Sequence, residues 1–133
     1  MESNLEKQNP MIRTLLLIGL GGSIGSILRY LSSVVIEKYY TTVFPLATFM
    51  INILGCLLIG IIMGTLEKNH VTDSSIKWLL VTGFCGGFTT FSTFGYENIR
   101  LLQNGNMALA FLYIGASVFV GLGSVWIGLT LVK

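Results

Sequence analysis

Long apolar runs separated by short polar stretches dominate the sequence. The runs cover residues 11–33, 43–66, 76–98 and 107–132. Each run is long enough to cross about 30 Å of hydrocarbon as a helix. Polar or turn-forming residues fill the stretches between them. The pattern predicts an all-α membrane protein, with four transmembrane helices that form a single domain over residues 1–133.

The third run differs from the others because glycines and hydroxyl side chains interrupt it. Its centre reads GFCGGFTTFSTF over residues 83–94. A helix should break there, and backbone groups left unpaired in hydrocarbon are tolerated only against protein, a bound ion or a water-filled cavity. We therefore interpret this stretch as the working part of a membrane transport protein, with helix resuming near Thr90 or Phe91.

The composition supports the membrane class. Hydrophobic residues make up 53% of the chain, charged residues make up 11%, and the mean hydropathy is +0.77, whereas soluble domains carry about 25% charged residues. The scattered net charge of +2 gives no reason to expect a nucleic-acid partner. Cys56 and Cys85 lack the spacing of a metal site or a disulfide framework. Because no nucleophile–base pair or cofactor motif emerges, we do not expect an enzyme.

The basic residues give almost no orientation signal. Five fall on the side of the N-terminus and three on the other side, without a cluster on either. This near balance suits a protein that inserts both ways up, and it also suits an ordinary protein whose N-terminus is inside. Small residues at four-residue spacing predict close helix packing. They occur at Gly21 and Gly25, at Gly60 and Gly64, and at Ser124 and Gly128.

Asn52 and two phenylalanines are candidates for chemistry. Asn52 is the strongly polar side chain near the middle of the second run, where it either bonds neighbouring helices or lines a pore. Phe91 and Phe94 share one face of a resumed helix. The edges of their rings are positive and can contact a small anion, although packing against neighbouring helices is the alternative. Freed N–H groups and hydroxyls also suit an anion, and freed carbonyls suit a hard cation.

Polar residues outside the break offer weaker candidates. Tyr113 and Ser117 lie four residues apart and would form a polar track, unless Tyr113 is an interfacial aromatic and Ser117 a packing residue. Glu97 and Arg100 have the spacing of a surface pair at a helix end. Arg29 ends the first run, from where it would reach toward the interface.

Taken together, these motifs resemble the CrcB/Fluc family of fluoride channels over essentially the whole chain. The most specific match is the stretch from Gly86 to Phe94. The supporting matches are Gly21-Gly22-x-x-Gly25 with Arg29-Tyr30, Phe44-Pro45-x-x-Thr48 with Asn52 and Gly55, Glu97, and Trp126 with Gly128.

The resemblance implies an antiparallel, dual-topology dimer in the cell membrane that passively exports fluoride from the cytoplasm. It implies a structural sodium ion at the dimer centre, held by the backbone carbonyls of Gly86 and Thr89. The residues that it implies for the fluoride pore are Asn52, Phe91, Phe94, Ser92, Thr93, Tyr113 and Ser117. The dimer is a homodimer, or a heterodimer with an oppositely oriented paralogue.

Other membrane functions fit the sequence less well. A small proton-coupled multidrug exporter needs a membrane-embedded acid, and the first run has none. A noncatalytic assembly subunit would explain the small-residue spacing, but it would leave the hydroxyl-rich break without a role.

Overall fold

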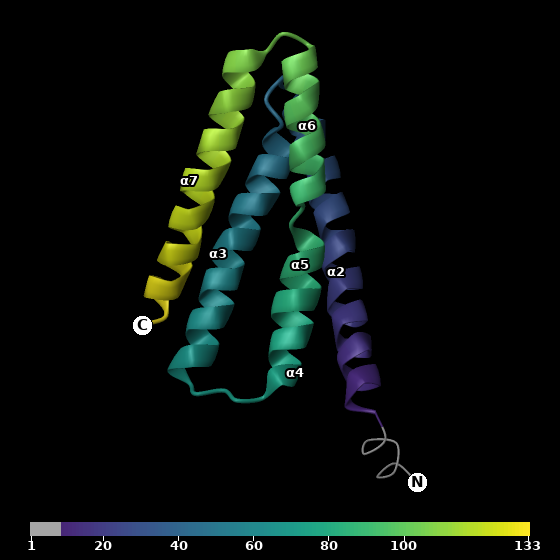
Figure 1. The fold of residues 1–133 in the computed structure, drawn as a ribbon, viewed down its shortest axis with the longest axis vertical. Coiled ribbons are helices and arrows are strands. Elements are labelled where there is room, and N and C mark those ends of the chain that lie inside the picture. Colours follow the sequence, from purple (N-terminus) through teal and green to yellow (C-terminus); the bar gives the residue numbers. More distant parts are fainter. Residues whose placement is uncertain (1–8) are drawn as a thin grey trace.

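The computed structural model describes residues 9–133, which form helices and contain no strand. The helical segments in chain order are α2 (Pro10–Tyr39), α3 (Leu46–Lys68), α4 (Ser74–Lys77), η1 (Trp78–Cys85), α5 (Gly86–Phe88), α6 (Phe91–Gln103) and α7 (Met107–Leu131). Figure 1 shows that α4 to α6 stack into one interrupted column beside the columns of α2, α3 and α7. The prediction of four helical columns with a broken third is therefore confirmed for the described residues.

Three of the columns are uninterrupted helices. In α2, α3 and α7 the length and apolar composition suffice to cross a membrane. The 23 residues of α3 extend over roughly 35 Å at about 1.5 Å per residue. With 30 residues, α2 is longer than the first apolar run and continues to Tyr39. The third column differs, because its helix is divided near the middle of the bundle.

Glycines join α2 to the first half of the third column. A Cβ atom on Gly21 would lie 2.8 Å from the backbone nitrogen of Phe84, and one on Gly25 would lie 2.8 Å from that of Phe88. Real Cβ atoms essentially never approach this closely, so the two backbones are in direct contact. The facing segment η1 is wound as a π-helix, in which hydrogen bonds span five residues. We name this contact the α2 seam.

A second seam of small residues joins α3 to α7. A Cβ atom on Gly128 would lie 2.8 Å from the backbone nitrogen of Ile61, and one on Gly60 would lie 3.1 Å from the Cα of Gly128. Gly64 faces Leu129 in the next turn, where the corresponding distance is 3.3 Å. The spacing of small residues therefore predicted both packing contacts, as expected where lipid-embedded helices approach closely.

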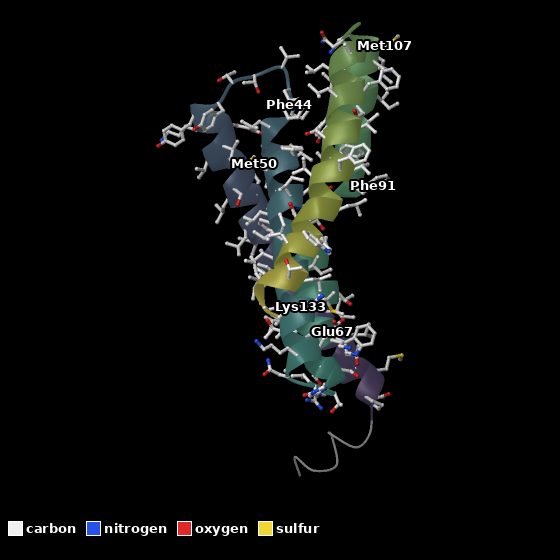
Figure 2. The ribbon with its side chains drawn as sticks, turned by 90° about the vertical axis from the view of Figure 1, so that its left-hand side faces the viewer. Phe44, Met50, Glu67, Phe91, Met107 and Lys133 are labelled. Carbon is white, nitrogen blue, oxygen red and sulfur yellow. The ribbon has the colours of Figure 1, made fainter. Side chains whose placement is uncertain are left out.

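Aromatic side chains pack where α6 meets α7. Tyr113 is fully buried with Leu101 and Ala110. Its ring makes edge contacts with Phe44, at a centroid distance of 5.1 Å, and with Phe94, at 5.0 Å. Figure 2 shows Phe44 near the end of the bundle that also carries Met107, with Glu67 and Lys133 toward the other end. This cluster fixes α6 beyond the break.

Candidate functional site: the helix break and its cavities

The third column breaks at two threonines in extended conformation. Thr89 has φ −83° and ψ 159°, and Thr90 has φ −149° and ψ 114°. Helix resumes at Phe91, as the sequence predicted. The Thr90 hydroxyl accepts a hydrogen bond of 3.2 Å from the backbone N–H of Thr93. Thr90 is therefore the N-cap of α6, a position that threonine commonly occupies.

Asn52 of α3 holds the broken backbone. Its Oδ1 accepts a 2.8 Å hydrogen bond from the N–H of Thr90, and its Nδ2 donates a 3.1 Å hydrogen bond to the Thr90 carbonyl. One side chain thus satisfies both backbone groups of a residue that helical bonds do not serve. Because a primary amide has two N–H donors, one remains for a further partner. Asn52 therefore bonds a neighbouring segment, as one reading of the sequence had it, and it also lines a cavity, while its place in a pore stays a prediction.

The break releases two backbone carbonyls. In a continuous helix the N–H of Thr90 would donate to the Gly86 carbonyl, and the N–H of Thr93 would donate to the Thr89 carbonyl. Here the first N–H donates to Asn52 and the second to the Thr90 hydroxyl. The carbonyls of Gly86 and Thr89 therefore lose their helical donors. Both residues line the same cavity.

A cavity of about 400 Å³ adjoins the break. We name it the break cavity. It brings together Asn52, Phe91, Phe94, Ser117, Gly86 and Thr89, with Cys56 and Cys85 also in its wall. None of its described lining residues is charged. The Ser117 Oγ is buried and has no hydrogen-bond partner among the described residues. The cavity is therefore lined by neutral polar side chains, by the two phenylalanines and by aliphatic residues such as Ile59, Val81 and Val118.

Phe91 and Phe94 lie side by side in the wall of the break cavity. Their ring centroids are 5.6 Å apart, with a tilt of 38° between the planes. Phe91 is 83% exposed, and Phe94 is half-buried against Tyr113. The prediction that the two rings share one helical face is confirmed.

The remaining sequence candidates lie around the break cavity. Thr93 lines a second cavity, and Ser92 is exposed, with its hydroxyl 3.4 Å from that of Thr90. Tyr113 lies deeper, and its hydroxyl donates a 2.8 Å hydrogen bond to Oε2 of Glu97. Because Tyr113 is fully buried, the interpretation of it as an interfacial aromatic is wrong.

Glu97 is not half of a surface pair, so that prediction from the sequence is wrong. Its Oε1 accepts a 2.7 Å hydrogen bond from the hydroxyl of the buried Thr48, and its Oε2 accepts the bond from Tyr113. Arg100 is exposed. The spacing along α6 suggested Arg100, but α3 and α7 supply the partners. A carboxylate within an apolar run was the available signal, because such a group usually has partners inside the protein.

Arg29 faces a second cavity, of about 270 Å³. We name it the arginine cavity. Hydroxyls of Ser26, Thr48, Thr90 and Thr93 also line it. The Arg29 Nε is buried and has no hydrogen-bond partner among the described residues. The expectation that Arg29 ends its helix and reaches toward the interface is wrong, because α2 continues to Tyr39 and the side chain borders this cavity.

The apolar helices and the broken third column define a multi-pass α-helical membrane protein. The family model described as CrcB-like protein, Camphor Resistance (CrcB), matches residues 16–129. The chain therefore belongs to the CrcB family, as its motifs indicated.

Relatives of this chain include several proteins named fluoride-specific ion channel FluC. The protein of that name from Flavobacterium psychrophilum is 53% identical over 122 residues, which cover 92% of this chain and 98% of the relative. The one from Phocaeicola vulgatus is 46% identical over 118 residues, or 89% of this chain and 97% of the relative. The one from Azobacteroides pseudotrichonymphae is 43% identical over 123 residues, or 92% and 98%.

Proposed function

We propose that this chain is a fluoride-selective channel that lets cytoplasmic fluoride leave the cell passively. The observation that carries the proposal is the break cavity, which places Phe91 and Phe94 beside Asn52 and the unpartnered hydroxyl of Ser117. The names of near-full-length relatives support the same function. They give no support to a multidrug exporter or an assembly subunit.

Neutral donors suit the passage of a small, strongly hydrated anion. An anion must bind well enough to enter a pore and weakly enough to leave it. The positive ring edges of Phe91 and Phe94 replace part of the hydration shell. The second N–H of Asn52 and the hydroxyl of Ser117 supply direct hydrogen bonds. An inside-negative potential then drives the anion outward, at about 2.3 kcal/mol per charge per 100 mV.

The polar residues around the break cavity extend the path. The arginine cavity serves as an entrance, because the positive charge of Arg29 raises the local concentration of anions. Thr90 lines both cavities and therefore stands between them. Ser92 and Thr93 provide hydroxyls beside it on the first turn of α6. Tyr113 continues the path on the side of Glu97.

The released carbonyls fit a structural sodium ion. Hard cations prefer several oxygen ligands, and one chain offers the carbonyls of Gly86 and Thr89 at the break. A second copy in antiparallel orientation would double this set and would cover the exposed ring of Phe91. The nearly balanced basic residues support two opposite orientations in the cell membrane. The dimer is a homodimer, or a heterodimer with an oppositely oriented paralogue. The ion would join the subunits and fix the break, without taking part in conduction.

Anion efflux from liposomes tests the proposed function. Liposomes that contain only this purified chain are loaded with fluoride, and efflux is started with a potassium ionophore and followed with a fluoride electrode. Fast fluoride efflux is expected, with chloride efflux at the level of protein-free liposomes. Equal efflux of both anions would contradict selectivity. The absence of fluoride efflux, both from the folded chain alone and after co-expression with a paralogue, would contradict the function.

Removal of sodium tests the cation site. The protein is purified throughout in a bulky organic cation in place of sodium, and its fluoride efflux and dimer content are measured. Both are expected to fall and to recover when sodium is restored. Activity and dimer content that are indifferent to sodium would contradict a site at Gly86 and Thr89.

A further inference from the structure

Two carboxylate side chains line one cavity at the end of the bundle that carries the α2–α3 connection. This cavity has a volume of about 340 Å³ and lies between the last turns of α2, residues 41–47 and α6. Glu37 and Glu97 border it, together with Tyr40, Thr41 and Thr42. No basic side chain is among its described lining residues. We name it the acidic cavity.

The acidic cavity is joined to the break cavity through a chain of contacts. Phe94 lines the break cavity, and its ring contacts that of Tyr113 at a centroid distance of 5.0 Å. The Tyr113 hydroxyl donates to Oε2 of Glu97 at 2.8 Å, and Glu97 borders the acidic cavity. Under the proposed function, in which Tyr113 continues the path on the side of Glu97, the acidic cavity lies where that path would leave the protein.

The charge of Glu37 has no close partner. Glu37 is exposed, and no hydrogen bond or ion pair of its carboxylate is found among the described residues. The adjacent Lys38 lies over the ring of Tyr39, with its Nζ 5.6 Å from the ring centroid. On α6, the exposed Arg100 does not border the cavity. The cavity wall therefore carries negative charge without a matching positive group.

We propose that Glu37 acts as an electrostatic brake on the fluoride pathway at this mouth. Its charge, next to that of Glu97, lowers the local concentration of anions and so lowers the rate of passage. This inference rests on the proposed function. It assigns Glu37 to the rate of conduction and leaves selectivity to the break cavity. The arginine cavity has the opposite sign and adjoins the acidic cavity, because Thr48 lines the first and donates a 2.7 Å hydrogen bond to Glu97 of the second.

Neutralising Glu37 tests the brake. In the liposome assay, Glu37→Gln is expected to raise the fluoride efflux rate about two- to fivefold at an ionic strength near 0.02 M. The gain should shrink below about 1.5-fold near 0.5 M salt, because screening then acts within a few ångströms. Changes in rim charge typically alter rates and their salt dependence in this way. A merely structural role for Glu37 would not produce this dependence on salt.

Charge-matched variants separate electrostatics from shape. Glu37→Asp keeps the charge and should retain the wild-type rate, whereas Glu37→Lys should exceed Glu37→Gln. Glu67→Gln is the control, because Glu67 is an exposed carboxylate of α3 toward the other end of the bundle (Figure 2). It should leave the rate unchanged.

The outcomes distinguish this inference from the proposed function. If the Glu37 variants and the wild type had the same efflux rate, the brake would be overturned and the proposed function would stand. A gain that persists at high salt, or one that Glu67→Gln reproduces, would also overturn it. Absence of fluoride efflux from the wild-type protein, both alone and after co-expression with a paralogue, would remove the proposed function, and the brake with it.

Discussion

The two halves of the third column are held in different ways. Before the break, η1 and α5 lie backbone to backbone against α2, where Gly21 and Gly25 leave no room for a Cβ atom. After the break, α6 is held by side-chain hydrogen bonds, with Glu97 bound by Thr48 and Tyr113. Backbone packing fixes the position of the first half, and side-chain chemistry defines the environment of the second.

Asn52 stands at the junction between the two halves. It bonds the backbone of Thr90 through both polar atoms of its amide, so α3 sets the place where one half ends and the other begins. Because backbone packs against backbone in the first half, substitutions that add side-chain volume there should lower the stability of the fold. The second half should respond to changes in charge and hydrogen bonding, and its response should appear in fluoride flux before it appears in folding.

The largest expected effect is a loss of folding from a volume change in the α2 seam. Gly25→Val places a branched side chain against the carbonyl of Phe84 and the backbone nitrogen of Phe88. Because backbone cannot move aside as a side chain does, the free energy of unfolding should fall by about 3 kcal/mol or more. Thermal unfolding in detergent and dimer yield measure the effect.

Gly19→Val is the matched control for the seam. It lies on the same helix, and a Cβ atom at Gly19 would meet nothing within 4 Å. Its unfolding temperature should stay close to that of the wild type. If Gly25→Val were as stable as Gly19→Val, the contrast between the two halves would not hold.

Asn52→Asp is expected to abolish conduction with a smaller loss of stability. The substitution removes the donor to the Thr90 carbonyl and places a carboxylate beside that oxygen and in the wall of the break cavity. The free energy of unfolding should fall by about 1–3 kcal/mol, in line with the loss of a partly buried hydrogen bond. Fluoride efflux should fall to the leak of protein-free liposomes, because the charge repels the anion.

The control for this substitution is Asn69→Asp. The Asn69 amide donates to the Thr65 carbonyl in an exposed turn, away from the cavities. Its efflux should match that of the wild type. Unchanged conduction in Asn52→Asp would leave Asn52 with a role in holding the backbone only.

Tyr113→Phe should have an intermediate effect on both properties. It keeps the buried ring in the aromatic cluster but removes the donor to Oε2 of Glu97. The loss should lower the free energy of unfolding by about 1 kcal/mol and should slow fluoride efflux severalfold. Tyr96→Phe serves as the control, since Tyr96 is 67% exposed on the neighbouring helix α6. Equal efflux in both variants would place Tyr113 outside the path.

Ser117→Ala is expected to have the smallest effect on stability while still slowing fluoride. The Ser117 hydroxyl has no partner among the described residues, so its removal breaks no hydrogen bond that they form. The unfolding temperature should stay close to that of the wild type. The efflux rate should fall about two- to tenfold, because one donor along the path is lost. Ser124→Ala is the control on α7, because the Ser124 hydroxyl donates to the Val120 carbonyl of its own helix. An unchanged rate in Ser117→Ala would remove this hydroxyl from the path.

Local sequence signals were sufficient for the helices, the break and the glycine seams. Apolar length, glycine spacing and the glycines and hydroxyls at the break are each features of one continuous segment, so the sequence displays them directly. The partners of Glu97 and the surroundings of Arg29 depend on which faces of separate helices meet. The spacing along α6 suggested Arg100 for Glu97, whereas Thr48 and Tyr113 come from helices distant in the chain. The sequence left the role of Asn52 undecided for the same reason, because its two hydrogen bonds to Thr90 join separate helical segments.

The most direct test of the break as the fluoride pathway is a fluoride-electrode recording of three proteins in matched liposomes. They are the wild type, Phe91→Ile and Phe94→Ile, each checked for an intact dimer before reconstitution. Isoleucine keeps the apolar bulk of each site but lacks the positive ring edge to which the proposed function assigns contact with the anion. Fast efflux is expected from the wild type, and efflux at the level of protein-free liposomes is expected from both variants. Full fluoride efflux in both variants, with dimers intact, would contradict the assignment of these rings to the pathway.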